Sequence, residues 1–167
     1  MNDKYIFRKI REDEICQMFQ MIIERIKWFD EKGIKQWNVT NYDKVYPKSY
    51  YQEKRKAGEL FVLEDREKNQ IVCGAVLKKD DNRWEDKSPA LYLHNFVSKI
   101  EEKNVGGIFL KFAEEYALKN EKKYFRLDSA ESNKNLAKYY ELHGFIPVGR
   151  CEEGLYKGIL REKDLSK

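Results

Sequence analysis

Histidine and cysteine are scarce in this chain of 167 residues, and their scarcity limits the metal centres and disulfide bonds that it could form. The two histidines are His94 and His143, so a centre built from clustered histidines is not expected, and we predict no metal. The three cysteines, Cys16, Cys73 and Cys151, are far apart and form no C-x-x-C motif. With no secretory signal pattern ahead of them, they are expected to be reduced thiols in a cytoplasmic protein.

Long hydrophobic runs are also missing. No apolar stretch approaches the roughly 18 residues that a membrane-spanning helix requires, so no membrane partner is expected. The net charge of +4, from 33 basic and 29 acidic residues, is spread along the chain. We therefore expect no nucleic-acid partner and only a slight preference for an anionic small ligand.

Apolar and aromatic side chains, by contrast, are abundant. Hydrophobic residues make up 41% of the sequence and aromatic residues 14%, which argues for a folded core and against disorder. The chain contains no internal repeat, linker or low-complexity segment. We therefore expect residues 1–167 to form a single domain with a core of ordinary size.

The spacing of apolar residues predicts four helices. Residues 15–29 carry apolar side chains at helical spacing, and Gly33 is placed to end that helix. Pro47 is expected to begin a second, shorter helix that stops near residue 58. Two more helices are predicted, over residues 104–119 and 133–144.

Short apolar runs predict the strands between these helices. They cover residues 5–10, 60–63, 71–77, 91–97, 124–128, 145–150 and 155–160. The polar turn between the second and third strands suits an antiparallel hairpin. The order βααβββαβαββ predicts an α+β fold, with a mixed central sheet of about seven strands flanked by about four helices.

The segment from Asn133 to Phe145 is the most informative local pattern. Asn133 is a good N-cap, because its side-chain oxygen can accept a hydrogen bond from a free amide of the first turn. Gly144 lies where a left-handed residue ends a helix without a Cβ clash. The short capped helix therefore holds Tyr140 between two strands. This spacing alone favours a packed core aromatic, but a phenol held there can also donate a proton to a leaving group.

A second pattern covers residues 98–107, where a strand is followed by a tight turn and a helix. Free backbone N–H groups and the helix dipole at such a junction favour an anion. Gly106 and Gly107 allow close approach of the backbone to phosphate, and Asn104 tolerates a left-handed conformation. On its own this pattern indicates a helix start more strongly than a phosphate site.

These two patterns and the order of elements make the whole chain resemble the GCN5-related N-acetyltransferase (GNAT) superfamily. The likeness is strongest over residues 91–148. The family has an Asn followed seven residues later by Tyr-x-x-x-Gly-Phe, and Asn133 with residues 140–145 matches that pattern. The family's acetyl-CoA turn, Gln/Arg-x-x-Gly-x-Gly/Ala, falls on residues 101–106.

The resemblance implies an N-acetyltransferase with acetyl-CoA as cosubstrate, in which an amine acceptor attacks the thioester directly in a ternary complex. The acceptor, a small-molecule or peptide amine, is not identified. The family often forms dimers, so the oligomeric state stays open between a monomer and a homodimer. The implied cofactor-binding residues are Phe96, Val97, Glu102, Lys103, Asn104, Val105, Gly106, Gly107 and Asn133.

The resemblance also suggests catalytic and substrate-binding residues. Tyr140 would donate to the departing thiolate, and His94, on the strand beside the expected thioester, is the first candidate for general base. The alternative for His94 is a hydrogen-bonded structural histidine. Asp128 is expected to bind the substrate amine or to cap the following turn. Trp37 is the aromatic residue expected at the acceptor cleft, with a packed satellite core as its alternative.

The acetyl-CoA turn departs from the family pattern at two positions. Glu101 replaces the usual Gln or Arg, and Asn104 replaces the first glycine. Glu101 and Glu102 also bring two carboxylates to the expected pyrophosphate. The residues that could restore positive charge are Lys99, Lys103 and Lys134. The departures leave open an alternative function, a degenerate GNAT-fold module that binds CoA, an acyl-CoA or a protein partner without catalysis.

Overall fold

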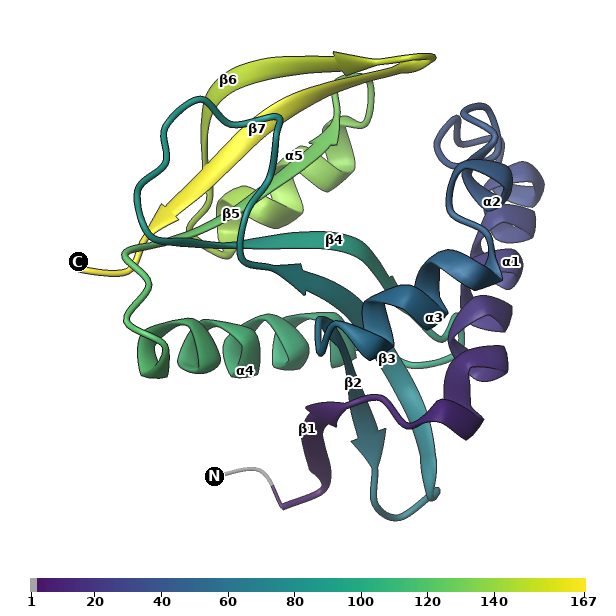
Figure 1. Cartoon of the computed structure of the whole chain (residues 1–167). Helices are drawn as coiled ribbons and strands as arrows, with labels where there is room; N and C mark the ends of the chain where they lie inside the picture. Colours follow the sequence, from purple (N-terminus) through teal and green to yellow (C-terminus); the bar gives the residue numbers. More distant parts are fainter. Residues whose placement is uncertain (1–2) are drawn as a thin grey trace. The chain divides into compact units, whose positions relative to one another are not determined.

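The computed structural model describes residues 3–167, which form seven strands, five α-helices and one short 3-10 helix (Figure 1). The strands are β1 (Tyr5–Lys9), β2 (Leu60–Asp65), β3 (Gln70–Lys78), β4 (Ala90–Ser98), β5 (Tyr124–Ala130), β6 (Ile146–Glu153) and β7 (Tyr156–Asp164). The helices are η1 (Glu12–Glu14), α1 (Ile15–Lys32), α2 (Tyr42–Val45), α3 (Lys48–Lys56), α4 (Val105–Lys119) and α5 (Lys134–Leu142). No helix in this part of the chain is long and apolar enough to cross a membrane.

The strands follow the order β1-β2-β3-β4-β5-β7-β6 in one mixed sheet. Strands β1, β2 and β3 are antiparallel neighbours, as are β5, β7 and β6, whereas β4 and β5 run parallel. This confirms the predicted α+β fold with seven strands. The sequence prediction lacked α2, because a four-residue helix is too short to show a periodic pattern.

The chain packs as two compact units. Unit 1 contains the residues up to Val76 together with 95–112, and unit 2 contains 77–94 together with 113–167. The boundary falls inside β3, β4 and α4. The single domain expected for residues 1–167 stays a prediction.

The core of unit 1 lies between α1 and the strands. Met18 and Ile22 of α1 are fully buried, and they belong to the same apolar cluster as Val62 of β2 and Val76 of β3. A Cβ added to Gly74 would lie 2.7 Å from Met18 Sδ, so a larger residue at this position would force the Met18 side chain to shift. The helix ends at Gly33, whose φ of 68° is left-handed, as the sequence predicts.

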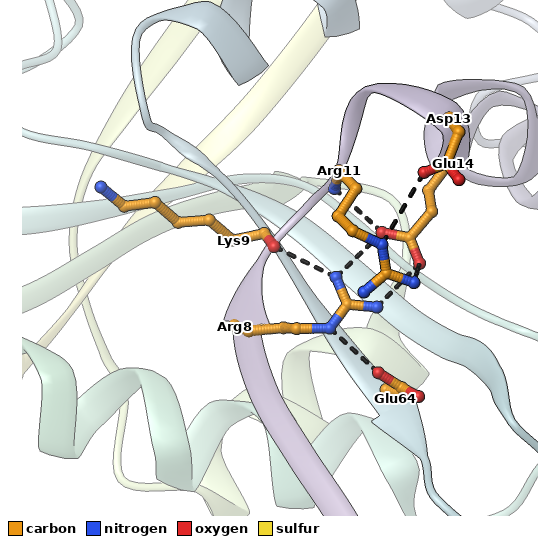
Figure 2. A network of polar contacts seen from close by, with 6 residues as sticks. All are labelled: Arg8, Lys9, Arg11, Asp13, Glu14 and Glu64. Atoms are coloured by element: carbon orange, nitrogen blue, oxygen red, sulfur yellow. Dashed lines mark hydrogen bonds and ion pairs between the residues drawn. The ribbon is translucent and has the colours of Figure 1, made fainter.

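A partly buried ion-pair network ties the start of α1 to β1 and β2 (Figure 2). Arg8 donates to both carboxylate oxygens of Glu14, over 2.9 and 2.7 Å, and to Glu64 Oε1 over 3.0 Å. Arg11 donates to Glu14 from its backbone amide and from its guanidinium. Burial raises the pKa of Glu14, but these hydrogen bonds outweigh it and hold the pKa below its ordinary value. The network thus fixes the junction between β1, β2 and α1.

Unit 2 is built around the long β6–β7 hairpin, drawn in yellow-green and yellow in Figure 1, which pairs through β7 with β5. Phe125 of β5 lies against Phe145, with ring centroids 5.3 Å apart. Phe145 follows Gly144, whose φ of 90° is the left-handed stop predicted for α5. This stop turns the chain from α5 into β6 and brings Phe145 into the core, where it is 1% exposed.

Arg126, the residue after Phe125 in β5, is a buried cation. Its guanidinium donates to Asp86 over 2.7 Å, to Glu162 over 2.8 Å and to the Tyr92 hydroxyl over 3.0 Å. It also lies over the ring of Trp84, 4.6 Å from the centroid. The charge is therefore neutralised inside unit 2 and holds the 80–89 loop against β5.

Candidate active site

The residues implied by the family resemblance are divided between the two units. In unit 1 are Trp37, Phe96, Val97 and the turn 102–107; in unit 2 are His94, Asp128, Asn133 and Tyr140. Unit 1 thus holds the anion turn with its aromatic neighbours, and unit 2 holds a polar cluster around His94.

The turn before α4 has the geometry expected of an anion-binding helix start. Asn104 has a φ of 65°, the left-handed conformation that asparagine tolerates. The first helical bond runs from the amide of Ile108 to the carbonyl of Asn104 over 3.3 Å. The amides of residues 105–107 thus precede the helical bonding pattern and remain available to a ligand.

The carboxylates at this turn are matched by lysines. Glu102 lies 2.5 Å from Lys68, which belongs to the β2–β3 turn, and Glu101 lies 3.6 Å from Lys99. Lys99 was among the predicted compensating residues, whereas Lys68 was missed because it is 34 positions away from Glu102. The two negative charges are therefore offset locally, which removes much of the electrostatic objection to a bound pyrophosphate.

Asn95 interrupts the regular conformation of β4 next to Phe96 and Val97. Its φ is 54°, and its side chain is held by two tyrosines of the α2–α3 region. Asn95 Nδ2 donates to the Tyr42 hydroxyl over 2.6 Å, and the Tyr50 hydroxyl donates to Asn95 Oδ1 over 2.8 Å. Irregularities of this kind redirect side chains beside active sites. The detectable signal was an asparagine within a largely apolar strand.

Trp37 packs within an aromatic row. Its ring stacks on Tyr42 with centroids 4.3 Å apart, and it meets Phe29 edge to face at 5.7 Å. It is half-buried against the core of unit 1. This arrangement favours the satellite-core alternative, and a role for Trp37 in acceptor binding stays a prediction.

In unit 2, the parallel pairing of β4 and β5 is short. It joins Ala90–Tyr92 to Tyr124–Arg126 and does not extend to His94 or Asp128, further along the same strands. Two residues singled out from the sequence are thus brought together just beyond the end of this ladder.

His94 makes a short contact with Asp81 from the charged loop. The distance from His94 Nε2 to Asp81 Oδ2 is 2.6 Å, and the side chains are only 12% and 6% exposed. Asp81 Oδ1 accepts the backbone amide of Arg83 over 2.9 Å. Burial raises the pKa of Asp81, but the hydrogen bond and charge of His94 outweigh it and lower the pKa to about 2. Asp81 is therefore ionised at neutral pH.

Asp128 is engaged on both oxygens. Arg83 Nη1 donates to Oδ1 over 3.1 Å, and the Tyr156 hydroxyl donates to Oδ2 over 2.6 Å. Arg83 also pairs with Glu153, 3.2 Å away. Burial, followed by the charge of Asp128, raises the pKa of Tyr156, so it remains a donor. These contacts favour a structural role for Asp128 over the predicted contact with the substrate amine.

One group of side chains in the described part of the chain has the spacing of a metal site. Its members are Asp81, His94 and Asp128, with one candidate ligand atom from each within 4.8 Å of the others. The guanidinium of Arg83 is already bound to Asp128, and a cation there would have to displace it or tolerate its charge. The group therefore fits an internally paired polar cluster better than a metal centre.

The helix α5 carries the last two predicted residues. Asn133 is confirmed as the N-cap, since its Oδ1 accepts the amide of Leu136 over 3.0 Å. Tyr140 is 6% exposed, and its ring meets those of Phe145 and Tyr139 at 5.9 and 5.5 Å. Tyr140 is therefore held rigidly by the core of unit 2.

The structure adds residues that sequence reasoning missed. They are Lys68, Asp81, Arg83, Asn95 and Tyr156, and each acts through a partner distant in sequence. Asp81 and Arg83 lie in a loop recognised only as charged. The nearest sequence signal was the placing of that charged loop directly before the strand that carries His94.

Comparisons with known proteins identify the fold. No protein-family model matches the chain, and no curated protein sequence matches it significantly. Among solved structures, a GNAT-family acetyltransferase from Listeria monocytogenes matches with a TM-score of 0.78 at 21% identity, over 96% of this chain and 94% of that one. One from Streptococcus agalactiae matches with a TM-score of 0.80 at 17% identity, over 98% and 97%.

A third match is the PaiA N-acetyltransferase from Thermoplasma acidophilum, solved in complex with coenzyme A. Its TM-score is 0.72 at 16% identity, and the match covers 98% of this chain and 99% of that one. Three solved structures, each matched over nearly its whole length, therefore have the fold that the order of elements predicts for this chain. The chain has the fold of the GNAT superfamily of acetyltransferases.

Proposed function

We propose that the protein is an N-acetyltransferase that transfers the acetyl group of acetyl-CoA to an amine acceptor. The observation that carries the proposal is the fold, which is shared over 96% or more of the chain with acetyltransferases. One of those is solved with coenzyme A. The left-handed Asn104 and the amides that open α4 supply the anion-binding turn that such a cosubstrate needs.

The residues assigned to acetyl-CoA binding are those that the family resemblance implies. The turn 102–107 would hold the pyrophosphate through its backbone amides. Phe96 and Val97 would offer backbone groups to the pantetheine arm and to the thioester oxygen, which stabilises an oxyanion. Asn133, at the start of α5, would contact the cofactor.

The chemistry needs a base for the attacking amine and a donor for the leaving thiolate. His94 is the proposed base and Tyr140 the proposed donor. A phenol, with a reference pKa of about 10, is a weaker acid than a thiol at about 8.5, so complete proton transfer is uphill by about 2 kcal/mol. The role assigned to Tyr140 is therefore a hydrogen bond with late or shared proton transfer.

Ligand-dependent stability tests the binding half of the proposal. Thermal unfolding is measured with acetyl-CoA, with CoA and without ligand. Acetyl-CoA at a hundred times its Kd should stabilise the folded state by about 3 kcal/mol, which raises the melting temperature. No stabilisation at millimolar acetyl-CoA would rule out both the enzyme and a CoA-binding module.

An acceptor screen tests the transfer half. Release of free CoA thiol is followed with polyamines, amino acids, aminoglycosides and peptide N-termini as separate acceptor sets. Stabilisation without thiol release from any set would favour the alternative of a degenerate module that binds CoA without catalysis. That alternative is motivated by Glu101 and Asn104, which replace the residues usual in the turn.

A further inference from the structure

The pair formed by His94 and Asp81 joins a strand residue to a loop residue within unit 2. Asp81 Oδ2 lies 2.6 Å from His94 Nε2, and Asp81 Oδ1 accepts the amide of Arg83 over 2.9 Å. Both side chains are largely buried. The carboxylate is thus fixed by its own loop and directed at one nitrogen of the imidazole.

This contact decides which nitrogen can act as a base. An ionised carboxylate accepts hydrogen bonds and has none to donate, so the hydrogen between the two groups belongs to His94 Nε2. The lone pair of the neutral ring then lies on Nδ1. A proton taken up by His94 must therefore be taken up at Nδ1.

Other charged and titratable groups on the neighbouring elements lie near the pair or contact residues beside it. They are Lys78 at the end of β3, Arg83 in the loop, Asp128 on β5, Cys151 and Glu153 on β6, and Tyr156 on β7. Arg83 forms ion pairs with Asp128 and Glu153, and so offsets the other carboxylates nearby. Asp81 is left as the carboxylate in direct contact with the imidazole.

We infer that Asp81 is a positioning residue for His94, which serves as general base through Nδ1. This inference rests on the proposed acetyl transfer. In that step the amine nitrogen bonds to the acetyl carbon and gives its proton to Nδ1. The carbon–sulfur bond breaks, and its electron pair leaves on the CoA sulfur. Asp81 remains ionised, holds the ring and stabilises the imidazolium that forms.

The tautomer of His94 is a direct test that needs no activity. Two-bond 1H–15N spectra of the protein labelled with 15N-histidine report which ring nitrogen carries the hydrogen, and a His143→Gln variant assigns the two histidines. We expect neutral His94 to carry hydrogen on Nε2, and Asp81→Asn to lose that preference. A wild-type ring with its hydrogen on Nδ1 would overturn the inference, even if the protein proves to be an acetyltransferase.

Kinetics with an acceptor from the screen supply the second test. Asp81→Asn should lower kcat about 10- to 100-fold and move the acidic limb of the kcat/KM profile to lower pH, with the KM for acetyl-CoA unchanged. The matched control is Asp80→Asn, which removes an exposed carboxylate from the adjacent position and should leave both the rate and the profile unchanged.

The outcomes separate the two proposals. No turnover by the wild type with any acceptor would overturn the proposed function. Turnover that survives in Asp81→Asn with an unchanged pH profile would overturn the positioning role and leave acetyl transfer in place. Melting temperatures of both variants, measured in the same buffers, show whether a lost rate reflects the site or the fold.

Discussion

The ammonium group of Lys68, in the β2–β3 turn, lies 2.5 Å from Glu102 Oε2 in the turn that precedes α4. Glu102 is largely buried, with 8% of its side chain exposed, whereas Lys68 is half exposed. The hydrogen bond to Glu102 raises the pKa of Lys68, so Lys68 is positively charged at neutral pH. A residue from outside the family's motif thus offsets a carboxylate inside it.

This pairing leads to a prediction about cofactor affinity. Lys68→Met should weaken acetyl-CoA binding about 3- to 10-fold, because Glu102 would then repel the pyrophosphate without compensation. Glu102→Gln should bind as tightly as the wild type or more tightly. Isothermal titration at low ionic strength measures both, and added salt should shrink the differences. Lys35→Met, a change at an exposed lysine, is the control; a wild-type Kd in Lys68→Met would contradict the prediction.

Tyr140 can be tested by removing its hydroxyl alone. Tyr140→Phe should bind acetyl-CoA normally and lower kcat at least 10-fold over the whole pH range, since only the leaving group loses a donor. Tyr139→Phe provides the matched control one position away. The readout is thiol release at saturating cosubstrate. Full turnover of Tyr140→Phe across pH would exclude the hydroxyl as the donor.

Arg126 offers a test of stability. Arg126→Met should lower the free energy of unfolding by about 2–4 kcal/mol, because Asp86 and Glu162 lose the buried cation that binds them. Arg150→Met breaks an ion pair to Glu131 at an arginine that is 76% exposed, and it should cost less than about 1 kcal/mol. Urea unfolding of the two variants compares them directly. Equal losses of unfolding free energy in the two variants would show that burial of the Arg126 charge does not determine its contribution to stability.

Acid stability should depend on Asp81. The folded-state pKa of about 2 lies below the ordinary value of 3.8, so ionised Asp81 stabilises the fold above pH 4. That contribution, about 2 kcal/mol, is lost as pH falls from about 4 to about 2. In Asp81→Asn, the free energy of unfolding should fall less steeply over this window. Denaturant melts from pH 2 to pH 5 check this, and an equally steep fall in the variant would contradict it.

The cysteines should differ sharply in reactivity. Cys16 is exposed and should be alkylated quickly in the folded protein. Burial raises the pKa of Cys73 and raises that of Cys151 to about 11, so the partly exposed Cys151 should react slowly and the buried Cys73 only after unfolding. Mass spectrometry after timed iodoacetamide treatment measures the order. Rapid labelling of Cys73 in the native protein would contradict this order. The Cys16→Ser variant also has a separate use, because it removes the background thiol from the CoA-release assay.

The local signals in the sequence were reliable where short-range physics decides the structure. Asn133 caps α5 with its own side chain, and Gly33 and Gly144 end helices in left-handed conformations. These features depend on a few neighbouring residues, so the sequence is sufficient to predict them. The helix α2 was missed for the opposite reason, because four residues carry no detectable period.

Sequence patterns could not predict the contacts between segments that are distant in the chain. Asp81 faces His94 because a loop of charged residues folds back on β4, and Arg83 reaches Asp128 across 45 positions. Side chains in loops have no periodicity that would assign them a direction. The structure gives Asp128 two such partners, Arg83 and Tyr156, and its contact with a substrate amine stays a prediction.

The sequence by itself determined the order of elements, the α+β class and the identities of His94, Tyr140 and Asn133 as residues of interest, because periodicity, caps and motif spacing act over short distances. Tertiary structure alone decided the partners of those residues. The ionic partner of Glu102 and the tautomer imposed on His94 depend on groups that meet only when the chain folds, and such contacts control charge and orientation in the candidate site.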